Sequence, residues 1–343
     1  MKRKRILDVG YGIKSLFNVY KTEQLSSRAL YGLVELSDKY NYDVEYISLK
    51  KSGILRHLKN NMLLFKPADG IIMPYLFIQP LLLFAFLRLF GLIKEKKLII
   101  ICHKTLVASN GLKNVFYKII YDSVDVFLFH SPKNLLESLK CIDKNKTKFM
   151  LWGENLSFVD KMFSIKEGDF FLSTGRENRD FEMLISAFSC LNSNLKIYTN
   201  TINYSTNYEF LKSLPQKQNI DVNFVDRSNS TTMFLAQQVA ECFCVVIPVT
   251  NSKLDYCVGL TSIVEAMAFG KPIIATRNPY SPIDIEKEGV GIWVETLDDW
   301  IRAISYLHSN VPIAKAMGRR GRQLAEKEYN IDETAKLLNS VLS

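Results

Sequence analysis

Short runs of consecutive apolar residues alternate along the chain with longer stretches in which apolar residues recur at helical spacing. Unbroken short apolar runs are typical of parallel strands that are buried on both faces, so the alternation predicts α/β layers. In the first half we expect helices between the strands, for example over residues 22–39 and 133–140. The expected strands cover residues 6–9, 44–49, 70–73, 98–102, 126–130 and 148–152.

The same pattern then starts again, and the chain ends in helical patterns over residues 297–308, 313–328 and 332–342. The expected strands of the second half cover residues 170–174, 195–198, 222–225, 244–248, 272–275 and 291–294. Two successive Rossmann-like domains fit this order, residues 1–155 and 165–325, followed by a C-terminal helix over 326–343. Ligands of such sheets lie beyond the carboxyl ends of the strands.

Residues 74–93 form a long apolar stretch that is interrupted by a glutamine, a proline and an arginine. Its length is that of a membrane span, but a spanning helix between two expected strands would divide one sheet. Two interpretations stay open: a core helix, or a helix whose apolar face rests on lipid. In the second, Arg88, Lys94, Lys96 and Lys97 would lie at the headgroups.

The composition restricts the class of protein and the compartment in which we expect it. With 343 residues, 48% of them hydrophobic and 23% charged, the chain is typical of a globular protein of about two domains. The six cysteines show neither a CxxC pair nor a zinc spacing, which favours reduced thiols in a reducing compartment. The first residues do not read as a secretory signal. We therefore expect a cytoplasmic protein, with peripheral attachment to the inner face of the membrane as an open alternative.

The positive charge is concentrated in the first half. Residues 1–160 hold 25 Lys/Arg and 14 Asp/Glu, a net charge of +11, whereas residues 161–343 carry −2. Nucleic acid and an anionic membrane surface are the candidate partners for such a basic half. No RNP-like aromatic run and no recognition-helix signature occurs, so we expect no nucleic acid.

The strongest chemical signal is the segment GLTSIVEAMAFGKPIIAT, residues 259–276. Gly259, Leu260, Thr261 and Ser262 stand where a helix begins, and the first free amides of a helix suit a diphosphate. Glu265 lies about one turn further, where its carboxylate can reach a ribose. The alternative is a plain helix capped by Thr261 or Ser262. A glutamate among apolar residues favours a function, because an unpaired buried carboxylate is costly.

A second signal opens the second domain, in the sequence FLSTGRENRDF at residues 171–181. Gly175 ends a strand, and Arg176 and Arg179 fall in the first turn of the next helix. Arginine forks match phosphate oxygens in a bidentate manner. The alternative is a surface turn with solvated charges.

Both segments resemble those of retaining GT-B glycosyltransferases, which carry a donor-site stretch of the form GxxxxxEAMAxGKPVI and an earlier GR…K/R-D segment. The resemblance implies a GT-B fold, with two Rossmann-like domains facing across a cleft and C-terminal helices that cross back to the first domain. It implies that Glu265 binds the ribose hydroxyls and that the helix amides bind the pyrophosphate. Cys257 departs from the pattern, because many members have a glutamate there that contacts the donor sugar.

The first half offers fewer residues for the site. Gly12 belongs to DVGYGIKS, which is neither a P-loop nor a GxGxxG motif but resembles the family's glycine loop after the first strand. His103 ends an expected strand and could hydrogen-bond a sugar hydroxyl or move a proton; the alternative is an imidazole satisfied by local backbone. His130 ends the next strand in the same way. Gly153 resembles a glycine that lines the donor cleft, and the role of Glu154 is open.

These observations predict a glycosyltransferase that moves a sugar from a nucleotide diphosphate to an acceptor hydroxyl. Arg176, Arg179 and the helix start would stabilise the departing diphosphate, while His103 would orient the sugar or acceptor. No DxD motif and no His/Asp cluster occurs, so we expect neither a metal nor a cofactor. The basic, apolar first domain favours a lipid-linked or cell-surface glycan acceptor, as in polysaccharide biosynthesis. A nucleotide-sugar epimerase and a non-catalytic GT-B binding protein, which Cys257 permits, remain alternatives.

Overall fold

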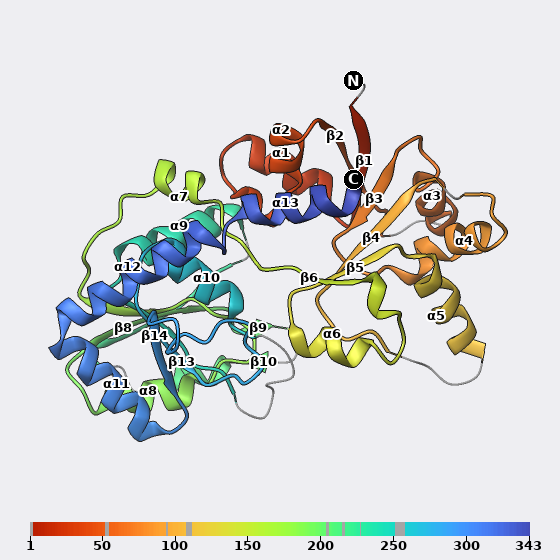
Figure 1. The fold of residues 1–343 in the computed structure, drawn as a ribbon. Coiled ribbons are helices and arrows are strands. Elements are labelled where there is room, and N and C mark those ends of the chain that lie inside the picture. Colours follow the sequence, from red (N-terminus) through yellow and green to blue (C-terminus); the bar gives the residue numbers. More distant parts are fainter. Residues whose placement is uncertain are drawn as a thin grey trace. The chain divides into compact units, whose positions relative to one another are not determined.

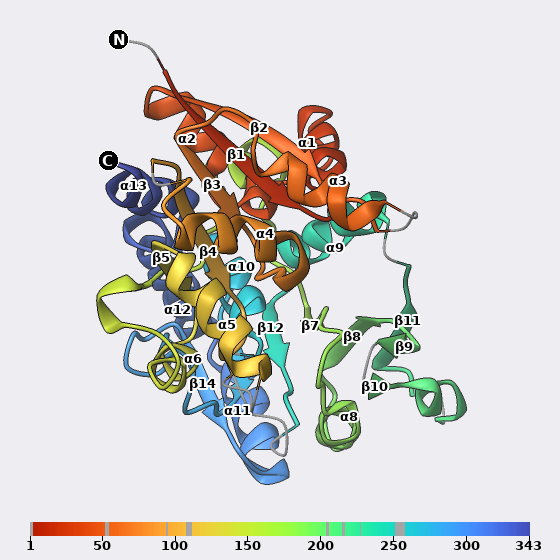
Figure 2. The ribbon, with the colours of Figure 1, turned by 90° about the vertical axis from the view of Figure 1, so that its right-hand side faces the viewer.

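The computed structural model describes residues 3–51, 55–93, 95–107, 112–203, 206–214, 217–226, 228–250 and 258–343. The chain forms two compact units. Unit 1 contains Met1–Leu151 together with Ile331–Ser343, and unit 2 contains Trp152–Asn330. Most elements of both are labelled in Figure 1, and β7, β11 and β12 are labelled in Figure 2.

Unit 1 is built on a six-stranded parallel sheet with the order β2-β1-β3-β4-β5-β6. The strands are β1 (Lys4–Gly10), β2 (Tyr42–Ser48), β3 (Gly70–Met73), β4 (Lys97–Cys102), β5 (Val126–Phe129) and β6 (Thr147–Phe149). The chain moves outward from β1 to β2 and then returns to the other side of β1 to form β3. The order therefore reverses between β1 and β3, and such a reversal opens a crevice at the carboxyl ends of the two strands.

Helices α3 (Arg56–Leu63), α4 (Ile78–Leu89) and α5 (Leu112–Ser123) lie side by side over one face of this sheet (Figure 2). Their apolar residues, such as Phe84 and Ile120, join Leu7 and Val9 of β1 in one buried core. Helices α1 (Ile13–Lys21) and α2 (Leu33–Lys39) contact β2, which is an edge strand of the sheet. The C-terminal helix α13 (Ile331–Leu342) packs against α2 and so belongs to unit 1.

Unit 2 repeats the architecture with the strand order β11-β8-β7-β12-β13-β14, again all parallel. Its strands are β7 (Phe170–Ser173), β8 (Asn194–Thr199), β11 (Ile220–Phe224), β12 (Cys244–Ile247), β13 (Ile273–Thr276) and β14 (Gly291–Val294). Its main helices are α7 (Leu156–Met162), α8 (Phe181–Ser189), α9 (Asn229–Glu241), α10 (Leu260–Ala268), α11 (Leu297–Ser309) and α12 (Val311–Lys327). The order reverses between β7 and β12, which places the second crevice there.

The predicted α/β class and both parallel sheets are confirmed, and each expected strand has a counterpart. The continuous helix expected over residues 22–39 is wrong. It is interrupted between η1 (Ser27–Leu30) and α2, where Tyr31 and Gly32 adopt left-handed φ angles of 52° and 81°. A right-handed helix cannot continue through two such residues.

The apolar stretch 74–93 contributes only the 12-residue α4. In the described part of the chain, no helix combines the length and the apolar character required to cross a bilayer. Arg88 and Lys96 do not extend outward as the lipid interpretation expected. Arg88 pairs with Asp125 at 2.9 Å, and Lys96 Nζ donates to the Leu64 carbonyl at 2.8 Å. Lys94 lies outside the described residues.

Candidate functional site

The switch point of unit 2 brings the two sequence signals to the same edge of the sheet. Strands β7 and β12 are neighbours, and the chain leaves their carboxyl ends toward Gly175 and toward α10 respectively. The connection from β12 to α10 includes residues 251–257, which lie outside the described part, so Cys257 has no structural account.

Helix α10 begins at Gly259, which adopts a left-handed conformation with φ 89°. A Cβ atom there would lie 2.9 Å from Ile247 Cγ2, so both the backbone angle and the space favour glycine. The N-cap is therefore Gly259 and not Thr261 or Ser262, the caps that the alternative interpretation required. The first hydrogen bond inside the helix is donated by Ile263, which leaves the three preceding amides without an acceptor in the helix.

Arg179 lies beside this helix start. Its backbone amide donates to the Tyr208 hydroxyl at 2.8 Å. The buried guanidinium donates through Nη1 to the Glu177 carbonyl at 2.8 Å, and its Nη2 lies 3.5 Å from Ser262 Oγ. A Cβ atom on Gly175 would overlap this guanidinium, so Gly175 provides the space in which it lies. The structure thus brings Gly175, Arg179 and Ser262 together.

Arg176 takes a different direction. Its Nη2 lies 3.4 Å from the carbonyl oxygen of Asp226, the second residue after β11. The pKa of Asp226 is lowered to about 2, chiefly by the hydrogen bond from the Thr231 hydroxyl, and the positive charge of Arg176 adds to this effect. The expectation that both arginines meet at the helix start is therefore met by Arg179 and not by Arg176 in this structure.

Glu265 occupies the half-buried side of α10. It follows Thr261 by four residues, so the two share a helix face, while Leu260 and Ile263 point into the core. Burial raises the pKa of Cys242 to about 12, and the charge of Glu265 adds a smaller contribution. The Glu265 carboxylate is therefore close enough to Cys242, which precedes β12, to affect its thiol, and it lies beyond the first turn of α10.

Lys271, which belongs to the same signature stretch, has a structural position. Its ammonium is buried and donates to the carbonyls of Lys166 at 2.6 Å and Cys242 at 2.7 Å. Burial lowers its pKa. All three residues precede strands and so lie at the amino edge of the sheet, opposite the helix start. Sequence reasoning alone did not separate this residue from its neighbours in the motif.

Unit 1 places two histidines at the carboxyl edge of its sheet. His103 follows β4 and His130 follows β5, and their ring centroids are 5.2 Å apart. The Tyr75 ring stacks on His103 at 4.6 Å, and the Tyr31 ring lies 5.7 Å from His103 and 6.4 Å from His130. Sequence reasoning missed both tyrosines, although Tyr75 stands just beyond a strand end, the position that singled out His103.

Both imidazoles are held in the neutral form. Burial lowers the pKa of His103 to about 4, with a hydrogen bond to the Pro74 carbonyl acting in the opposite direction. Burial also lowers the pKa of His130 to about 3, and His103 adds to this shift. His130 Nδ1 lies 2.9 Å from the Met150 carbonyl. A base with a pKa near 4 is weak at neutral pH, so His103 suits hydrogen bonding to a hydroxyl better than proton abstraction.

Asp8 is a further group that sequence reasoning passed over. It lies in the middle of β1, paired in register with Tyr46 and Ile72, and is 1% exposed. Neither carboxyl oxygen has a hydrogen-bond partner among the described residues, and burial raises its pKa well above the usual value. The signal was an acidic residue within a strand that is otherwise apolar.

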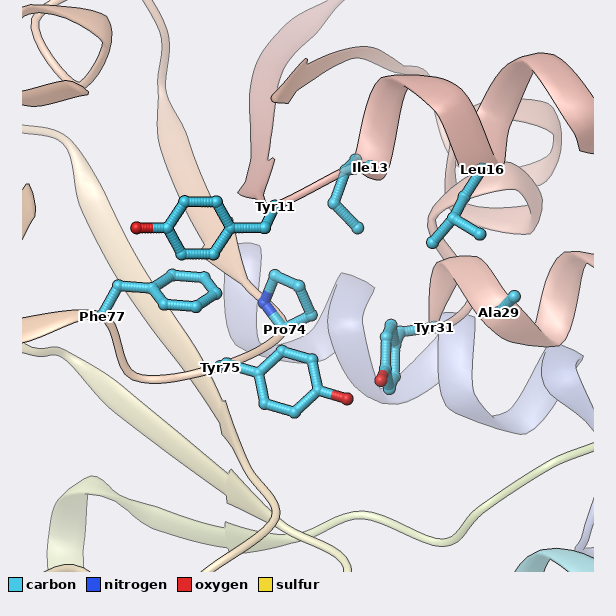
Figure 3. A pocket seen from close by; sticks show the side chains of 8 residues that line it. All are labelled: Tyr11, Ile13, Leu16, Ala29, Tyr31, Pro74, Tyr75 and Phe77. Atoms are coloured by element: carbon cyan, nitrogen blue, oxygen red, sulfur yellow. The ribbon is translucent and has the colours of Figure 1, made fainter. Parts of the chain in front are cut away.

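Gly12 caps the N-terminus of α1 with a φ of 75°. A Cβ atom there would meet nothing within 4 Å, so the backbone angle and not crowding favours glycine. Near it, a cavity of about 300 Å3 opens at the switch point between β1 and β3 (Figure 3). The described lining residues are Tyr11, Ile13, Leu16, Ala29, Tyr31, Pro74, Tyr75 and Phe77.

The comparisons with known proteins agree with this architecture. Residues 164–324 match the family model described as glycosyl transferases group 1. The matched residues lie within unit 2. A search of curated proteins returned no match to the chain.

Solved structures resemble the whole chain. A glycosyltransferase from Rickettsia africae has a TM-score of 0.69 at 15% identity and covers 100% of this chain and 98% of its own. A sucrose-phosphate synthase from Thermosynechococcus elongatus gives 0.67 at 16%, covering 99% and 98%. The Anabaena protein HepE, in complex with UDP and glucose, gives 0.66 at 13%, covering 99% of both chains. At such identities these likenesses show the fold, which is the two-domain GT-B fold.

The residues matched by this family model include Gly175, Arg179, Ser262 and Glu265, whereas Gly12 and both histidines lie in unit 1, outside the matched residues. Glu154, whose role was open, is buried: its amide donates to the Tyr329 carbonyl at 3.1 Å and its Oε1 accepts from the Asn155 amide. It is therefore placed to hold the start of unit 2. Within the described residues, no three His, Cys, Asp or Glu side chains are grouped so that they could hold a metal ion.

Proposed function

We propose that the protein is a glycosyltransferase that moves a sugar from a nucleotide-diphosphate donor to an acceptor hydroxyl with retention of anomeric configuration. One observation carries the proposal: the buried Arg179 guanidinium lies 3.5 Å from Ser262, at the N-terminus of α10. The match of residues 164–324 to glycosyl transferases group 1 supports sugar transfer.

Two sources of positive potential converge at this point. The first amides of α10 have no acceptor within the helix, and the helix dipole places a partial positive charge there. The guanidinium adds a full charge in a setting largely removed from water, where electrostatic interactions are strong. A diphosphate would be bound by both, and the charge that develops on it as the sugar departs would be stabilised.

The donor is, in this proposal, a uridine diphosphate sugar, because the similar Anabaena protein was solved with UDP and glucose. Glu265 would accept hydrogen bonds from the ribose hydroxyls. Since the arginine and the helix start supply positive charge, we propose that neither a metal nor another cofactor takes part. Chelation with EDTA should then leave the binding of UDP unchanged.

A thermal-shift series with UDP, GDP and UDP-glucose tests the donor site. A ligand that binds only the folded state raises the melting temperature. We expect UDP to give the largest shift and Glu265→Ala to remove it. Glu241→Ala is the matched control, because Glu241 is also half-buried in unit 2 but lies at the amino edge of the sheet. A UDP shift that survives Glu265→Ala intact would refute the ribose assignment.

Product analysis separates transfer from the other activities. Proton NMR of UDP-glucose incubated with the protein alone would reveal an epimerase by a new sugar signal without any acceptor. With an acceptor present, the coupling constant of the anomeric proton reports whether the configuration is retained. Nucleotide binding without transfer to any acceptor would instead favour a binding protein.

For the acceptor we propose a lipid-linked or cell-surface glycan precursor, reached by peripheral contact with the inner face of a membrane. Helices α3, α4 and α5 expose a large amount of apolar surface on the side away from the core of unit 1. The apolar side chains that are more than half exposed on or shortly after these helices are Leu58, Met62, Phe86, Leu89, Phe90, Leu92, Val115 and Phe116. Exposed lysines on the same helices, Lys59 and Lys118, and the +11 charge of residues 1–160 would favour anionic headgroups.

Flotation with phosphatidylcholine vesicles, with and without phosphatidylglycerol, tests this contact. We expect binding that requires the anionic lipid and is lost when Phe86 and Phe90, whose rings are 4.9 Å apart, are both replaced by serine. Phe234→Ser is the matched control, because Phe234 is an exposed aromatic of unit 2. Equal flotation of the double variant and the wild-type protein would refute the proposed surface.

A further inference from the structure

The segment between β7 and α8, which carries Arg179, is held on one side by the residues that follow β12. The Asp180 amide donates to the Pro248 carbonyl at 3.1 Å, and the Thr250 amide donates to the Asn178 carbonyl at 3.0 Å. These two bonds form a short antiparallel bridge. The bridge therefore fixes the residues directly before and after Arg179.

The Arg179 amide faces away from this bridge. Arg179 lies opposite Val249, and in a trans peptide unit the C=O and N–H groups point in opposite directions. Because the Asn178 carbonyl points toward the bridge, the Arg179 amide, which belongs to the same peptide unit, points to the other side. Arg179 is 8% exposed, and a buried amide without an acceptor is costly. The Tyr208 hydroxyl supplies the acceptor, at 2.8 Å.

Tyr208 is fixed by contacts of its own. It follows the short antiparallel pair β9 (Ile202–Asn203) and β10 (Thr206–Asn207), which is labelled in Figure 2. Its side chain is 3% exposed and belongs to the core of unit 2, where its ring meets the Phe181 ring edge to face at 4.9 Å. Core packing therefore determines where the hydroxyl lies, and the hydroxyl in turn holds the Arg179 amide.

The backbone before Arg179 needs such support. Asn178 has a φ of 51°, a left-handed angle that few residues other than glycine adopt. Angles of this kind persist where surrounding contacts hold them, and they are concentrated at functional sites. From this turn the guanidinium donates to the Glu177 carbonyl at 2.8 Å and reaches to 3.5 Å from Ser262 Oγ. A shift of the backbone at Arg179 would therefore move the guanidinium relative to the start of α10.

We propose that Tyr208 is a positioning residue of the diphosphate site, which holds the Arg179 guanidinium at the start of α10 through one hydrogen bond to the Arg179 amide. This role rests on the proposed function, in which Arg179 binds the diphosphate. Tyr208 is too deeply buried to contact a ligand itself, so it acts through Arg179. A misplacement of about 1 Å is enough to impair a precisely arranged site. Loss of the hydroxyl should therefore weaken the binding of the phosphates and not that of the nucleoside.

Tyr208→Phe tests this consequence, because it keeps the ring and removes only the hydroxyl. Isothermal titration calorimetry should show a rise in Kd of about tenfold for UDP. Saturation-transfer difference NMR should show an unchanged Kd for uridine, which lacks the phosphates. Tyr198→Phe is the matched control, since Tyr198 is another buried tyrosine of unit 2, whose hydroxyl donates to Gln238 Oε1 at 3.1 Å. It should change neither Kd.

Amide hydrogen exchange, measured by NMR on protein that is isotope-labelled at arginine, tests the hydrogen bond itself. Tyr208→Phe should accelerate the exchange of the Arg179 amide by about tenfold or more, because local opening becomes easier. The amide of Arg302, in the middle of α11, should exchange at the wild-type rate. An unchanged rate at Arg179 would overturn the inference, whatever the effect on UDP binding.

Arg179→Ala separates this inference from the proposed function. If Tyr208 acts through Arg179, adding Tyr208→Phe to Arg179→Ala should cause no further loss of UDP affinity. Wild-type affinity for UDP in Arg179→Ala would refute the donor site and the inference together. A loss in Arg179→Ala with wild-type affinity in Tyr208→Phe would refute only the inference, and so would equal losses for UDP and uridine in Tyr208→Phe.

Discussion

The guanidinium of Arg179 lies so close above Gly175 that a single methyl group at Gly175 would overlap its Nε atom. Arg179 follows Gly175 by four residues in the connection between β7 and α8. Because Gly175 has no side chain, the Arg179 side chain can lie over it. From that position Arg179 reaches Ser262 at the start of α10. The geometry of the proposed diphosphate site therefore depends on a glycine that would not itself contact the ligand through a side chain.

Gly175→Ala should weaken UDP binding while the protein remains folded. The added methyl group displaces the end of a flexible side chain rather than backbone, so the loss of stability should be small. Removing one charge-assisted contact costs about 1.5–3 kcal/mol, which corresponds to a rise in Kd of roughly tenfold to a hundredfold. Isothermal titration calorimetry measures the change.

Two controls accompany this variant. Gly289→Ala also replaces a glycine of unit 2, at a φ of 65° with nothing within 4 Å of the new Cβ. It should lower stability by about 1 kcal/mol through backbone strain and leave UDP binding unchanged. If Gly175 acts through Arg179, the double variant Gly175→Ala/Arg179→Ala should bind UDP no more weakly than Arg179→Ala alone. Additive losses would contradict the argument.

Lys271→Met should lower stability without affecting the ligand. The methionine fills similar space but leaves the carbonyls of Lys166 and Cys242 without their buried donor. An unsatisfied buried polar group costs about 1–3 kcal/mol. Urea unfolding should show that loss, and the UDP Kd of the folded protein should not change. A large rise in Kd at full stability would instead place Lys271 in the donor site.

The two buried histidines should make unit 1 sensitive to acid. Their pKa values of about 4 and about 3 lie below the usual 6.5, so the unfolded state binds protons that the folded state does not. Stability is therefore complete above about pH 6.5 and decreases as the pH falls toward 4, by up to about 1.4 kcal/mol per pH unit for each histidine. Urea unfolding of His103→Gln and His130→Gln should show a shallower decrease.

His57→Gln provides the comparison for this series, because His57 is exposed on α3. It should reproduce the wild-type pH dependence. An unchanged slope in both buried-site variants would mean that the histidines are protonated in the folded protein.

Asp8→Asn should stabilise the protein at neutral pH. Burial raises the pKa of Asp8, so the folded state retains a proton that the unfolded state releases. Its contribution is favourable below the usual pKa of 3.8 and is lost as the pH rises from there toward the raised value. We expect a gain of about 1–3 kcal/mol at about pH 7 and little gain near pH 4. A destabilised variant at neutral pH would indicate a charged Asp8 with a partner.

The strands were the most predictable part of the fold. Buried parallel strands such as β4 and β5 read as unbroken apolar runs, because both faces are covered. The helix expected over residues 22–39 is interrupted at Tyr31 and Gly32, next to a segment that is distant in the sequence. Tyr31 and Gly32 take left-handed angles where α13, about 300 residues later in the chain, packs against Gly32. No local sequence pattern contains that contact.

The candidate site also contains residues that the sequence identified and residues whose contacts it did not predict. Gly259, Gly175 and Arg179 were identified from their residue types and their positions after strands, since the carboxyl ends of parallel strands share one edge. Arg176 was assigned to the diphosphate because arginine forks match phosphate oxygens. Arg88 and Lys96 were placed at lipid headgroups in one of the two interpretations that the sequence left open. The structure gives each of them a partner within the protein. A charged residue in a sequence indicates that its side chain needs a polar or charged partner, but the sequence does not say which group that partner is.

By itself the sequence determined the alternation of strands and helices, the two-domain plan and the glycine-led helix start, because these follow from local hydrophobic periodicity and backbone preference. Only the tertiary structure decided which side chains meet: Arg179 with Ser262, Tyr75 with His103, and Asp8 in a setting without a hydrogen-bond partner among the described residues. The physical reason is that burial and side-chain contact are set by the packing of segments far apart in the chain, and the pKa values and the cavity follow from that packing.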